Sequence, residues 1–159
     1  MAGDAAAQAA LIERFYSAFA ARDHATMASC YRPDARFSDP AFGELRGEEV
    51  TSMWRMLCER GTDLEIAYRD VEASGDRGSA HWDADYTFSA TGRRVHNEID
   101  ASFRFADGLI ADHEDRFSFW RWSRQALGPA GALLGWTPLL RGKVRGQARA
   151  QLRDYMAEG

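Results

Sequence analysis

The apolar residues of this chain change their spacing once, near residue 62, and this change limits the folds that the chain can adopt. Before it, apolar residues recur every three or four positions, as Leu11, Phe15 and Phe19 do, which is the period of an amphipathic helix. Asp23 is typical of a helix N-cap, and Gly61 is typical of a helix C-terminus. We therefore expect helices over about residues 5–21, 23–31 and 48–60.

After residue 62 apolar and polar residues alternate, as they do from Trp82 to Phe88, which is the period of a strand with one buried face. Turn signals separate the alternating segments, at Ser74-Gly75-Asp76, Thr91-Gly92 and Asp107-Gly108. The pattern predicts an antiparallel meander of four strands, of which the last runs from Leu109 to about Trp122. A further short strand is expected over residues 34–39.

Strands with one apolar and one charged face form a curved sheet that is covered on one side. The expected fold class is therefore α+β, with a cone-shaped, curved antiparallel sheet wrapped around the N-terminal helices. A chain of 159 residues has the length of one domain. We expect the cone domain to span residues 1–122, and residues 123–159 to form a C-terminal helical extension packed on it.

The composition favours an ordinary globular protein, since 45% of the residues are hydrophobic and 28% are charged. Cys30 and Cys58 each fall within an apolar helical pattern, which favours buried free thiols and a reducing, cytoplasmic location. The first ten residues lack the basic start and apolar core of a signal peptide, and no apolar run is long enough to cross a bilayer.

The net charge of −4 is unevenly distributed along the chain. Residues 1–119 carry 13 basic and 22 acidic residues, a balance of −9, whereas residues 120–159 carry 7 basic and 2 acidic residues, a balance of +5. A basic tail can bind nucleic acid or an anionic membrane, but it is more often a solvated helix face or docks on an acidic partner subunit. We expect no nucleic-acid partner and no stable membrane association. The alternative is that Trp136, Leu139 and Leu140 touch an anionic membrane surface.

Two segments of the chain resemble a known superfamily. The segment FYSAFAARDHATMASCYRPDARFSDPAFGELRG resembles the opening of nuclear transport factor 2-like proteins, especially ketosteroid isomerases and SnoaL-like polyketide cyclases. The segment GRRVHNEIDASFRFADGLIADHEDRF resembles the last two long strands of that superfamily. The resemblance implies the cone fold, a homodimer formed through the outer sheet face, and a small hydrophobic molecule as the ligand.

The resemblance also places individual residues. Asp39 falls where ketosteroid isomerases keep their general-base aspartate. The tyrosine of their oxyanion hole falls on Phe15, which has no hydroxyl, and their protonated aspartate falls on Ala101. The ketosteroid isomerase oxyanion hole is therefore not reproduced, although Tyr16 and Asp100 are each one residue away.

Strand alternation places four polar side chains on inward, apolar faces: Asp39, Asn97, His113 and Asp115. A buried carboxylate is costly unless it is paired or protonated, so such groups are usually either paired or used. The functional interpretation is an acid–base cluster whose catalytic residues are Asp39, His113 and Asp115. In it, Asp39 is the base at the pocket mouth, and His113 shuttles protons while Asp115 or Asp39 holds it.

The same interpretation assigns substrate-binding residues. Tyr16 and Asn97 donate hydrogen bonds to a substrate oxygen. The walls of an apolar pocket come from Trp54, Tyr86, Phe103 and Phe117. No cofactor is expected, and no metal, because no histidine follows His113-x-Asp115 and because His81-x-Asp83-x-Asp85 lies on the outer face.

These observations leave several functions open. The first is an acid–base enzyme of isomerase, cyclase, dehydratase or epoxide hydrolase type that acts on a small hydrophobic molecule. The second is a non-catalytic binder of such a molecule, in which the His–Asp pair only satisfies itself. The third is a dimeric protein-interaction module that uses the outer sheet face, which carries Arg94, His96, Glu98 and Arg104.

Overall fold

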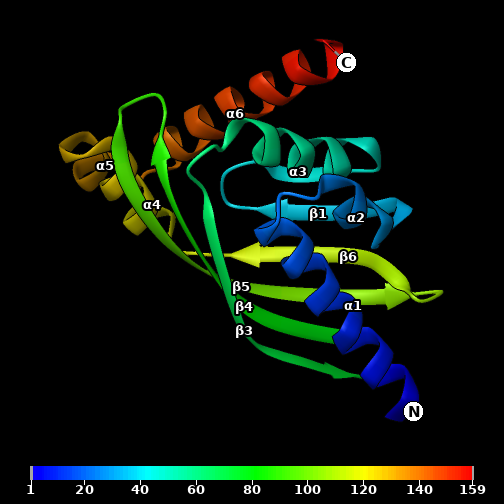
Figure 1. Ribbon diagram of the computed structural model, residues 1–159. Helices are drawn as coiled ribbons and strands as arrows, with labels where there is room; N and C mark the ends of the chain where they lie inside the picture. The colour runs from blue at the N-terminus through cyan, green and yellow to red at the C-terminus, as the bar shows by residue number, and fades with distance from the viewer. Residues whose placement is uncertain (1, 159) are drawn as a thin grey trace.

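The computed structural model describes residues 2–158 and contains helices on a six-stranded sheet (Figure 1). The elements in chain order are α1 (Ala2–Ala20), α2 (His24–Ser29), β1 (Tyr31–Asp39), β2 (Gly43–Arg46), α3 (Glu48–Arg60), β3 (Glu65–Ser74), β4 (Arg77–Phe88), β5 (Arg93–Ala106), β6 (Leu109–Arg116), α4 (Phe119–Leu127), α5 (Pro129–Leu134) and α6 (Pro138–Glu158). The strand order is β2-β1-β6-β5-β4-β3. All neighbouring strands are antiparallel except β1 and β6, which are parallel.

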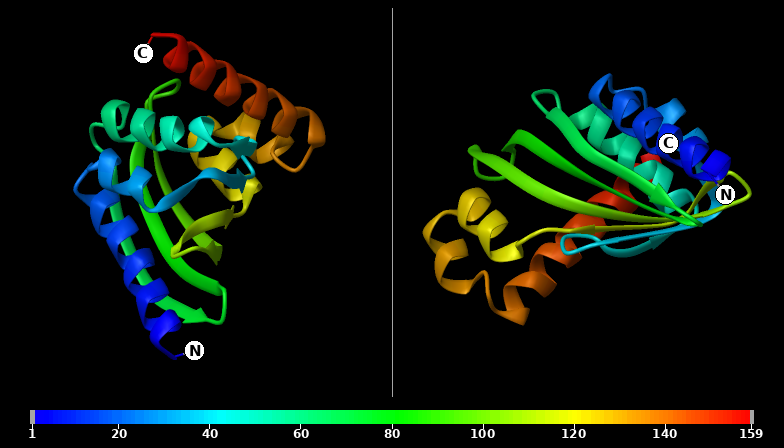
Figure 2. Two further views of the ribbon diagram at one scale, coloured as in Figure 1. Left: turned by 90° about the vertical axis from the view of Figure 1, so that its right-hand side faces the viewer. Right: turned by 90° about the horizontal axis from the view of Figure 1, so that it is seen from below.

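The sheet is strongly curved and does not close, and α1, α2 and α3 cover its concave side (Figures 1 and 2). Their apolar stripes fill the space between helices and sheet, where Phe15, Phe19 and Trp54 are 0–2% exposed. Trp82 on β4 contacts this cluster from the sheet, with its ring centroid 5.5 Å from that of Phe19. The α+β cone expected from the sequence is confirmed.

The turn between α1 and α2 is fixed by two adjacent residues. Arg22 has a positive φ of 60°, and its guanidinium donates hydrogen bonds of 2.9 Å to the carbonyls of Thr62 and Leu64. Asp23 caps α2, because its side chain accepts a hydrogen bond of 3.1 Å from the Thr26 N–H. The end of α1 is therefore tied to the loop between α3 and β3.

The second helix ends earlier than expected, and β1 begins earlier. The sequence pattern predicts helix up to Tyr31, but α2 ends at Ser29 and Tyr31 opens β1. Pro33 lies within β1, in the stretch between Tyr31 and Arg36 where the pairing with β6 shifts register. A proline without an N–H is tolerated in such an irregular stretch.

Two further differences concern the sheet. The short strand β2 was not expected, and it pairs with the end of β1 through a turn at Gly43, whose φ is +73°. The last strand, expected to reach Trp122, ends at Arg116, and Ser118 then caps α4 by accepting a hydrogen bond from the Arg121 N–H. Alternation at Phe117-Ser118-Phe119 mimics a strand, whereas Phe119, Trp122 and Ala126 follow helical spacing and bury one face of α4.

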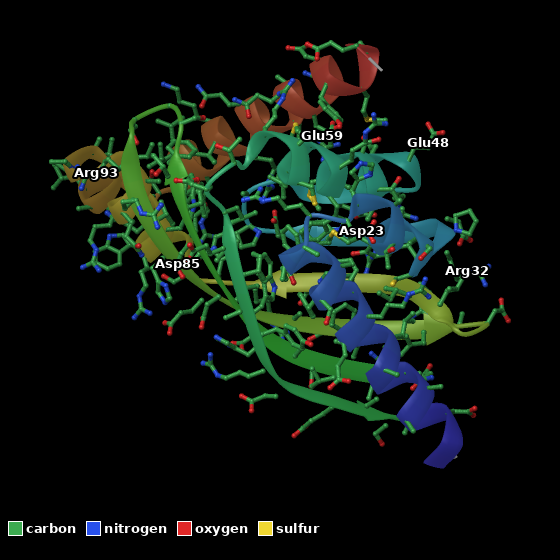
Figure 3. The ribbon with its side chains drawn as sticks, in the orientation of Figure 1. Asp23, Arg32, Glu48, Glu59, Asp85 and Arg93 are labelled. Carbon is green, nitrogen blue, oxygen red and sulfur yellow. The ribbon has the colours of Figure 1, made fainter. Side chains whose placement is uncertain are left out.

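The C-terminal helices pack on two parts of the cone (Figure 2). Phe119, Trp122 and Ala126 of α4 form a second apolar cluster with Val95 of β5. The helix α6 lies along α3, where Leu152 enters the main core. Glu59 of α3, labelled in Figure 3, accepts a hydrogen bond from Tyr155 of α6. The expected division at 122/123 stays a prediction, and α4 runs across it. Within residues 2–158 no helix is long and apolar enough to cross a membrane.

Gly131→Ala tests the packing of α5 on α4. A Cβ at Gly131 would lie 1.9 Å from the Ser123 carbonyl oxygen, so α5 would have to move away from α4. We expect this overpacking to lower the free energy of unfolding by about 1–3 kcal/mol. A Cβ at Gly146, in the middle of α6, meets nothing within 4 Å. The control Gly146→Ala should therefore stabilise the protein by up to about 1 kcal/mol. Urea unfolding measures both, and equal effects of the two changes would contradict the packing.

Candidate functional site

A chain of buried side-chain hydrogen bonds lies between the helices and the concave face of the sheet. Trp54 Nε1 donates to the Tyr31 hydroxyl at 2.9 Å, and that hydroxyl lies 2.6 Å from His113 Nδ1. On the other side of the ring, His113 Nε2 lies 2.8 Å from Asp115 Oδ1. Trp82 Nε1 makes a longer contact of 3.5 Å with the same carboxylate oxygen. The exposed fraction of His113 is 0% and that of Asp115 is 3%, so this chain is shielded from water.

The donor and acceptor roles in this network follow one order, from Trp54 through Tyr31 and His113 to Asp115. The indole N–H of Trp54 can only donate, so the Tyr31 oxygen accepts, and its own proton is free to point at His113 Nδ1. His113 then accepts at Nδ1 and donates its Nε2 proton to the Asp115 carboxylate. In this arrangement both nitrogens of a neutral imidazole are satisfied.

The elements that position these groups are far apart in the sequence. Tyr31 is the first residue of β1, and Trp54 lies on the buried face of α3. His113 and Asp115 share a face of β6, where His113 pairs with Phe37 of β1 and Phe103 of β5. The Phe103 ring lies 4.4 Å from the imidazole, centroid to centroid. Aromatic rings thus surround the imidazole and exclude water from it.

Asp39 lies at the end of β1, beside the turn into β2. Its Oδ1 accepts hydrogen bonds from the N–H groups of Ala41 at 2.9 Å and Phe42 at 2.6 Å. Burial raises the pKa of Asp39 to about 7, and the negative charge of Asp115 adds to this rise, while the two N–H groups and Arg145 oppose it. Asp39 makes no hydrogen bond with His113, which is held by Asp115 and Tyr31 instead. A carboxyl with this pKa can accept or donate a proton near neutral pH.

Tyr16 and Asn97 are two buried residues of the cone that lie outside this chain of hydrogen bonds. The Tyr16 hydroxyl is buried and has no hydrogen-bond partner among the described residues. Burial raises the pKa of Tyr16 well above its ordinary value, and the nearby charge of Asp115 raises it further. Asn97 is 7% exposed on the concave face of β5, opposite Ala84 of β4.

Tyr86 and Phe117 connect the cone with the C-terminal helices. Trp122 Nε1 of α4 donates a hydrogen bond of 2.7 Å to the Tyr86 hydroxyl. Burial raises the pKa of Tyr86 to about 12, although this hydrogen bond opposes the rise, and the charge of Asp39 adds to it. Phe117 follows the end of β6 and packs against both apolar clusters. Tyr86 therefore lies between Asp39 and the α4 helix.

Two hollows of this structure lie outside the cone interior. One, of about 400 Å³, is on the outer face of the sheet and is lined by His81, Glu98, Asp100, Arg116, Phe117, Ser118 and Arg121. The other, of about 550 Å³, is at the hairpin between β3 and β4. Among the predicted site residues, Phe117 alone lines either of them. An apolar pocket around the predicted residues therefore stays a prediction.

A second group of titratable residues lies on the outer face of the sheet. The ligand atoms of His81, Asp83 and Glu98 lie within 4.8 Å of one another, close enough to hold a metal ion. However, Asp83 already pairs with Arg69 at 3.0 Å. Glu98 pairs with Arg121 at 2.9 Å. A cation would have to displace the guanidinium groups of Arg69 and Arg121. The cluster of His81, Asp83 and Glu98 is therefore better explained as a network of surface ion pairs. Asp85, labelled in Figure 3, continues the network with His96 at 2.7 Å.

Sequence analysis missed Tyr31 and the polar role of Trp54. The expected helix over residues 23–31 placed Tyr31 at a helix end, and Trp54 was expected only as an apolar wall. The signal that could have found Tyr31 is Pro33, because a proline favours extended geometry in the residue before it, here Arg32, which directly follows Tyr31. A strand that begins before Pro33 places Tyr31, Ala35 and Phe37 on buried positions of β1.

The matched variants Tyr31→Phe and Tyr16→Phe test this distinction between the two tyrosines. Tyr31→Phe leaves Trp54 Nε1 and His113 Nδ1 without partners inside the core, so we expect a loss of about 1–3 kcal/mol in the free energy of unfolding. Tyr16→Phe removes a hydroxyl that has no partner, so we expect no loss or a small gain. Urea unfolding of both variants measures the difference, and an equal loss in the two would contradict the assignment.

The raised pKa of Asp39 predicts a pH-dependent stability. Between its ordinary value of 3.8 and about 7, the folded protein holds the Asp39 proton and the unfolded chain releases it. The contribution of this residue to the free energy of unfolding therefore falls as the pH rises through that window, by on the order of 4 kcal/mol. Asp39→Asn keeps an acceptor for the two N–H groups and carries no charge. We expect its advantage in stability over the natural protein to grow between pH 5 and pH 8, and a constant difference would refute the shift.

Comparison with solved structures shows the same fold in several proteins. A protein from Jannaschia sp. CCS1 named as a SnoaL-like polyketide cyclase has a TM-score of 0.68 at 14% identity, over 79% of this chain and 94% of that one. An LEH-like epoxide hydrolase from M. tuberculosis has a TM-score of 0.63 at 17% identity, over 82% and 96%. TerC, co-crystallised with polyporic acid, has a TM-score of 0.60 at 20% identity, over 70% and 91%.

A search of curated proteins finds no match to the chain. The family model of the SnoaL-like domain matches residues 12–113, a span that begins in α1 and ends at His113 on β6. This span includes Asp39, Trp54 and Tyr31 and covers more than half of the sequence. The chain belongs to the SnoaL-like domain family, within the nuclear transport factor 2-like, ketosteroid-isomerase-like fold.

Proposed function

We propose that this protein is an acid–base enzyme that transfers a proton within a small hydrophobic molecule, in the manner of an isomerase or cyclase. The observation that carries the proposal is the contrast between paired and unpaired polar groups in the core. His113, Tyr31 and Trp54 satisfy one another, whereas the buried Tyr16 hydroxyl has no partner. A buried donor that costs stability is typical of a group retained for a ligand.

Each polar group has one role in the proposed reaction. Asp39 in its carboxylate form takes a proton from a carbon next to a substrate carbonyl, and later returns that proton to another atom of the same molecule. Tyr16 donates a hydrogen bond to the carbonyl oxygen, on which negative charge develops. Asn97 offers a second donor on the same concave face. His113 holds Asp115 at 2.8 Å and is a positioning residue.

The aromatic side chains near the proposed catalytic groups favour an apolar or aromatic substrate. On the concave side of the sheet, Phe103 and Trp82 belong to the main aromatic core, and Tyr86 packs against it. The proteins of the same fold include one named as a polyketide cyclase and one crystallised with polyporic acid. These names support, for this chain, a small apolar or aromatic molecule that carries an enolisable carbonyl.

A second candidate function is non-catalytic binding of the same kind of molecule. It is favoured by the His113–Asp115 pair, which is complete within the protein and needs no substrate. In that case Asp39 would be a structural part of the turn, where it caps two N–H groups. Native mass spectrometry would then show a bound molecule that leaves the protein unchanged.

Deuterium incorporation next to a carbonyl tests the proposed chemistry without knowledge of the natural product. A panel of enolisable cyclic and aromatic ketones is incubated with the protein in D₂O and followed by ¹H NMR. We expect Asp39→Asn to reduce the exchange rate by about 10²–10⁴-fold, because the base is lost. Tyr16→Phe should reduce it by about 10²–10³-fold, because an oxyanion donor is lost.

Tyr68→Phe is the matched control for Tyr16→Phe. The Tyr68 ring stacks on Tyr16 at 5.6 Å, and its hydroxyl pairs with Ser17 at 3.1 Å instead of facing the core. This change should leave the exchange rate within about twofold of the natural protein. Exchange that persists in Asp39→Asn would remove Asp39 as the base. A panel that shows binding without exchange would favour the non-catalytic function.

A further inference from the structure

The segment from Phe117 to Arg153 has a charge pattern unlike that of the rest of the chain. It contains no acidic residue. Its basic residues are Arg121, Arg124, Arg141, Lys143, Arg145, Arg149 and Arg153. This segment includes α4, α5 and most of α6, so the C-terminal helices carry a net positive charge in an otherwise acidic protein.

Exposed apolar side chains gather in the same segment. Among the described residues, the large apolar side chains classed as exposed are Trp120, Leu133, Leu134, Trp136 and Leu139. Leu133 and Trp136 are each 72% exposed, and Leu139 is 85% exposed. We call Leu133, Leu134, Trp136 and Leu139 the apolar corner, since they occupy the end of α5, the link and the first turn of α6.

The apolar corner is placed where a flat binding partner can reach it. It lies at the end of the molecule away from the N-terminus of α1, where α5 and the start of α6 stand out from the cone (Figures 1 and 2). Arg141 and Lys143 follow Leu139 within about one helical turn and are exposed. The Arg124 guanidinium lies 4.9 Å from the Trp120 ring centre. Exposed apolar side chains and basic side chains are therefore adjacent in this part of the structure.

We propose that the apolar corner binds reversibly to the surface of an anionic lipid bilayer. Tryptophan and leucine side chains enter the interface between headgroups and acyl chains, while arginine and lysine attract anionic headgroups. The binding is peripheral, because no helix within the described residues can span a membrane. It does not depend on the proposed chemistry, and it is sensitive to salt because its electrostatic part is screened.

A second copy of the chain fits this surface less well. The outer sheet face is charged, and its residues pair with one another, as Arg36 does with Asp112 at 2.8 Å. Among the described residues it therefore offers little apolar surface for Trp136 and Leu139. Contact between two apolar corners would bring two basic segments together, which costs energy through like-charge repulsion. A bilayer has both the apolar layer and the opposite charge.

Co-sedimentation with vesicles tests the proposal on the full chain. Vesicles of phosphatidylcholine are compared with vesicles in which about one lipid in four is phosphatidylserine, at low and at high salt. We expect binding to the anionic vesicles only, its loss at high salt, and a blue shift of tryptophan emission as Trp136 leaves water. Binding of neither vesicle at low salt would overturn the proposal.

Three pairs of changes identify the surface that binds. Trp136→Ala with Leu139→Ala should weaken binding by at least about tenfold, and Trp136→Phe with Leu139→Ile should retain it. Arg141→Gln with Lys143→Gln should weaken binding by roughly tenfold. The control Arg46→Gln with Arg77→Gln removes the same charge from β2 and β4 and should bind as the natural protein does. Equal weakening by the control would overturn the proposal.

Light scattering after gel filtration decides between a bilayer and a second copy. We expect Trp136→Ala with Leu139→Ala to leave the molar mass in solution unchanged, because the apolar corner is free in the absence of lipid. A dimer that this change converts to monomers would show that the corner is covered by a second copy and would overturn the proposal.

Discussion

The burial of Asp115 beside His113 is the constraint on which the interior of this protein depends. A carboxylate that is 3% exposed has lost most of its contact with water, and it is tolerated only where donors replace that water. The donors come from His113 on the same strand and, at longer range, from Trp82 on β4. The histidine needs its own partner, which is Tyr31 on β1, and Tyr31 is in turn held by Trp54 on α3. One network therefore sets how α3, β1, β4 and β6 can pack together.

This network also divides the polar groups of the core into two kinds. Those along the chain from Trp54 to Asp115 are satisfied by the fold itself, so their first effect is on stability. The Tyr16 hydroxyl is buried close enough to Asp115 for that charge to raise its pKa, and yet the fold provides no partner for it. The core provides hydrogen-bond partners for the Tyr31 hydroxyl but none for the Tyr16 hydroxyl, which lowers its local stability. Such local costs are concentrated at binding and catalytic sites.

The sequence predicts the fold well because the change of hydrophobic period is strong and local. Strand parity also places Asn97, His113 and Asp115 on the buried face, as the structure shows. Prediction from hydrophobic spacing fails where a short stretch fits both the strand period and the helix period. At Phe117-Ser118-Phe119 the end of a strand and the start of a helix have the same pattern. Sequence patterns cannot identify Tyr31 as the link between Trp54 and His113, because these partners lie 23 and 82 residues away in the chain. The raised pKa of Asp39 has the same origin, since burial and Asp115 are properties of the folded chain.

The C-terminal helices connect the interior with the proposed membrane surface. Trp122 of α4 holds the Tyr86 hydroxyl, and Arg149 of α6 donates hydrogen bonds to the carbonyls of Phe42 and Glu44 beside Asp39. The segment that covers this end of the cone is therefore the segment that carries the apolar corner and the basic residues. If the apolar corner binds a bilayer as proposed, the helices that approach the lipid are also those that contact Tyr86 and the turn beside Asp39.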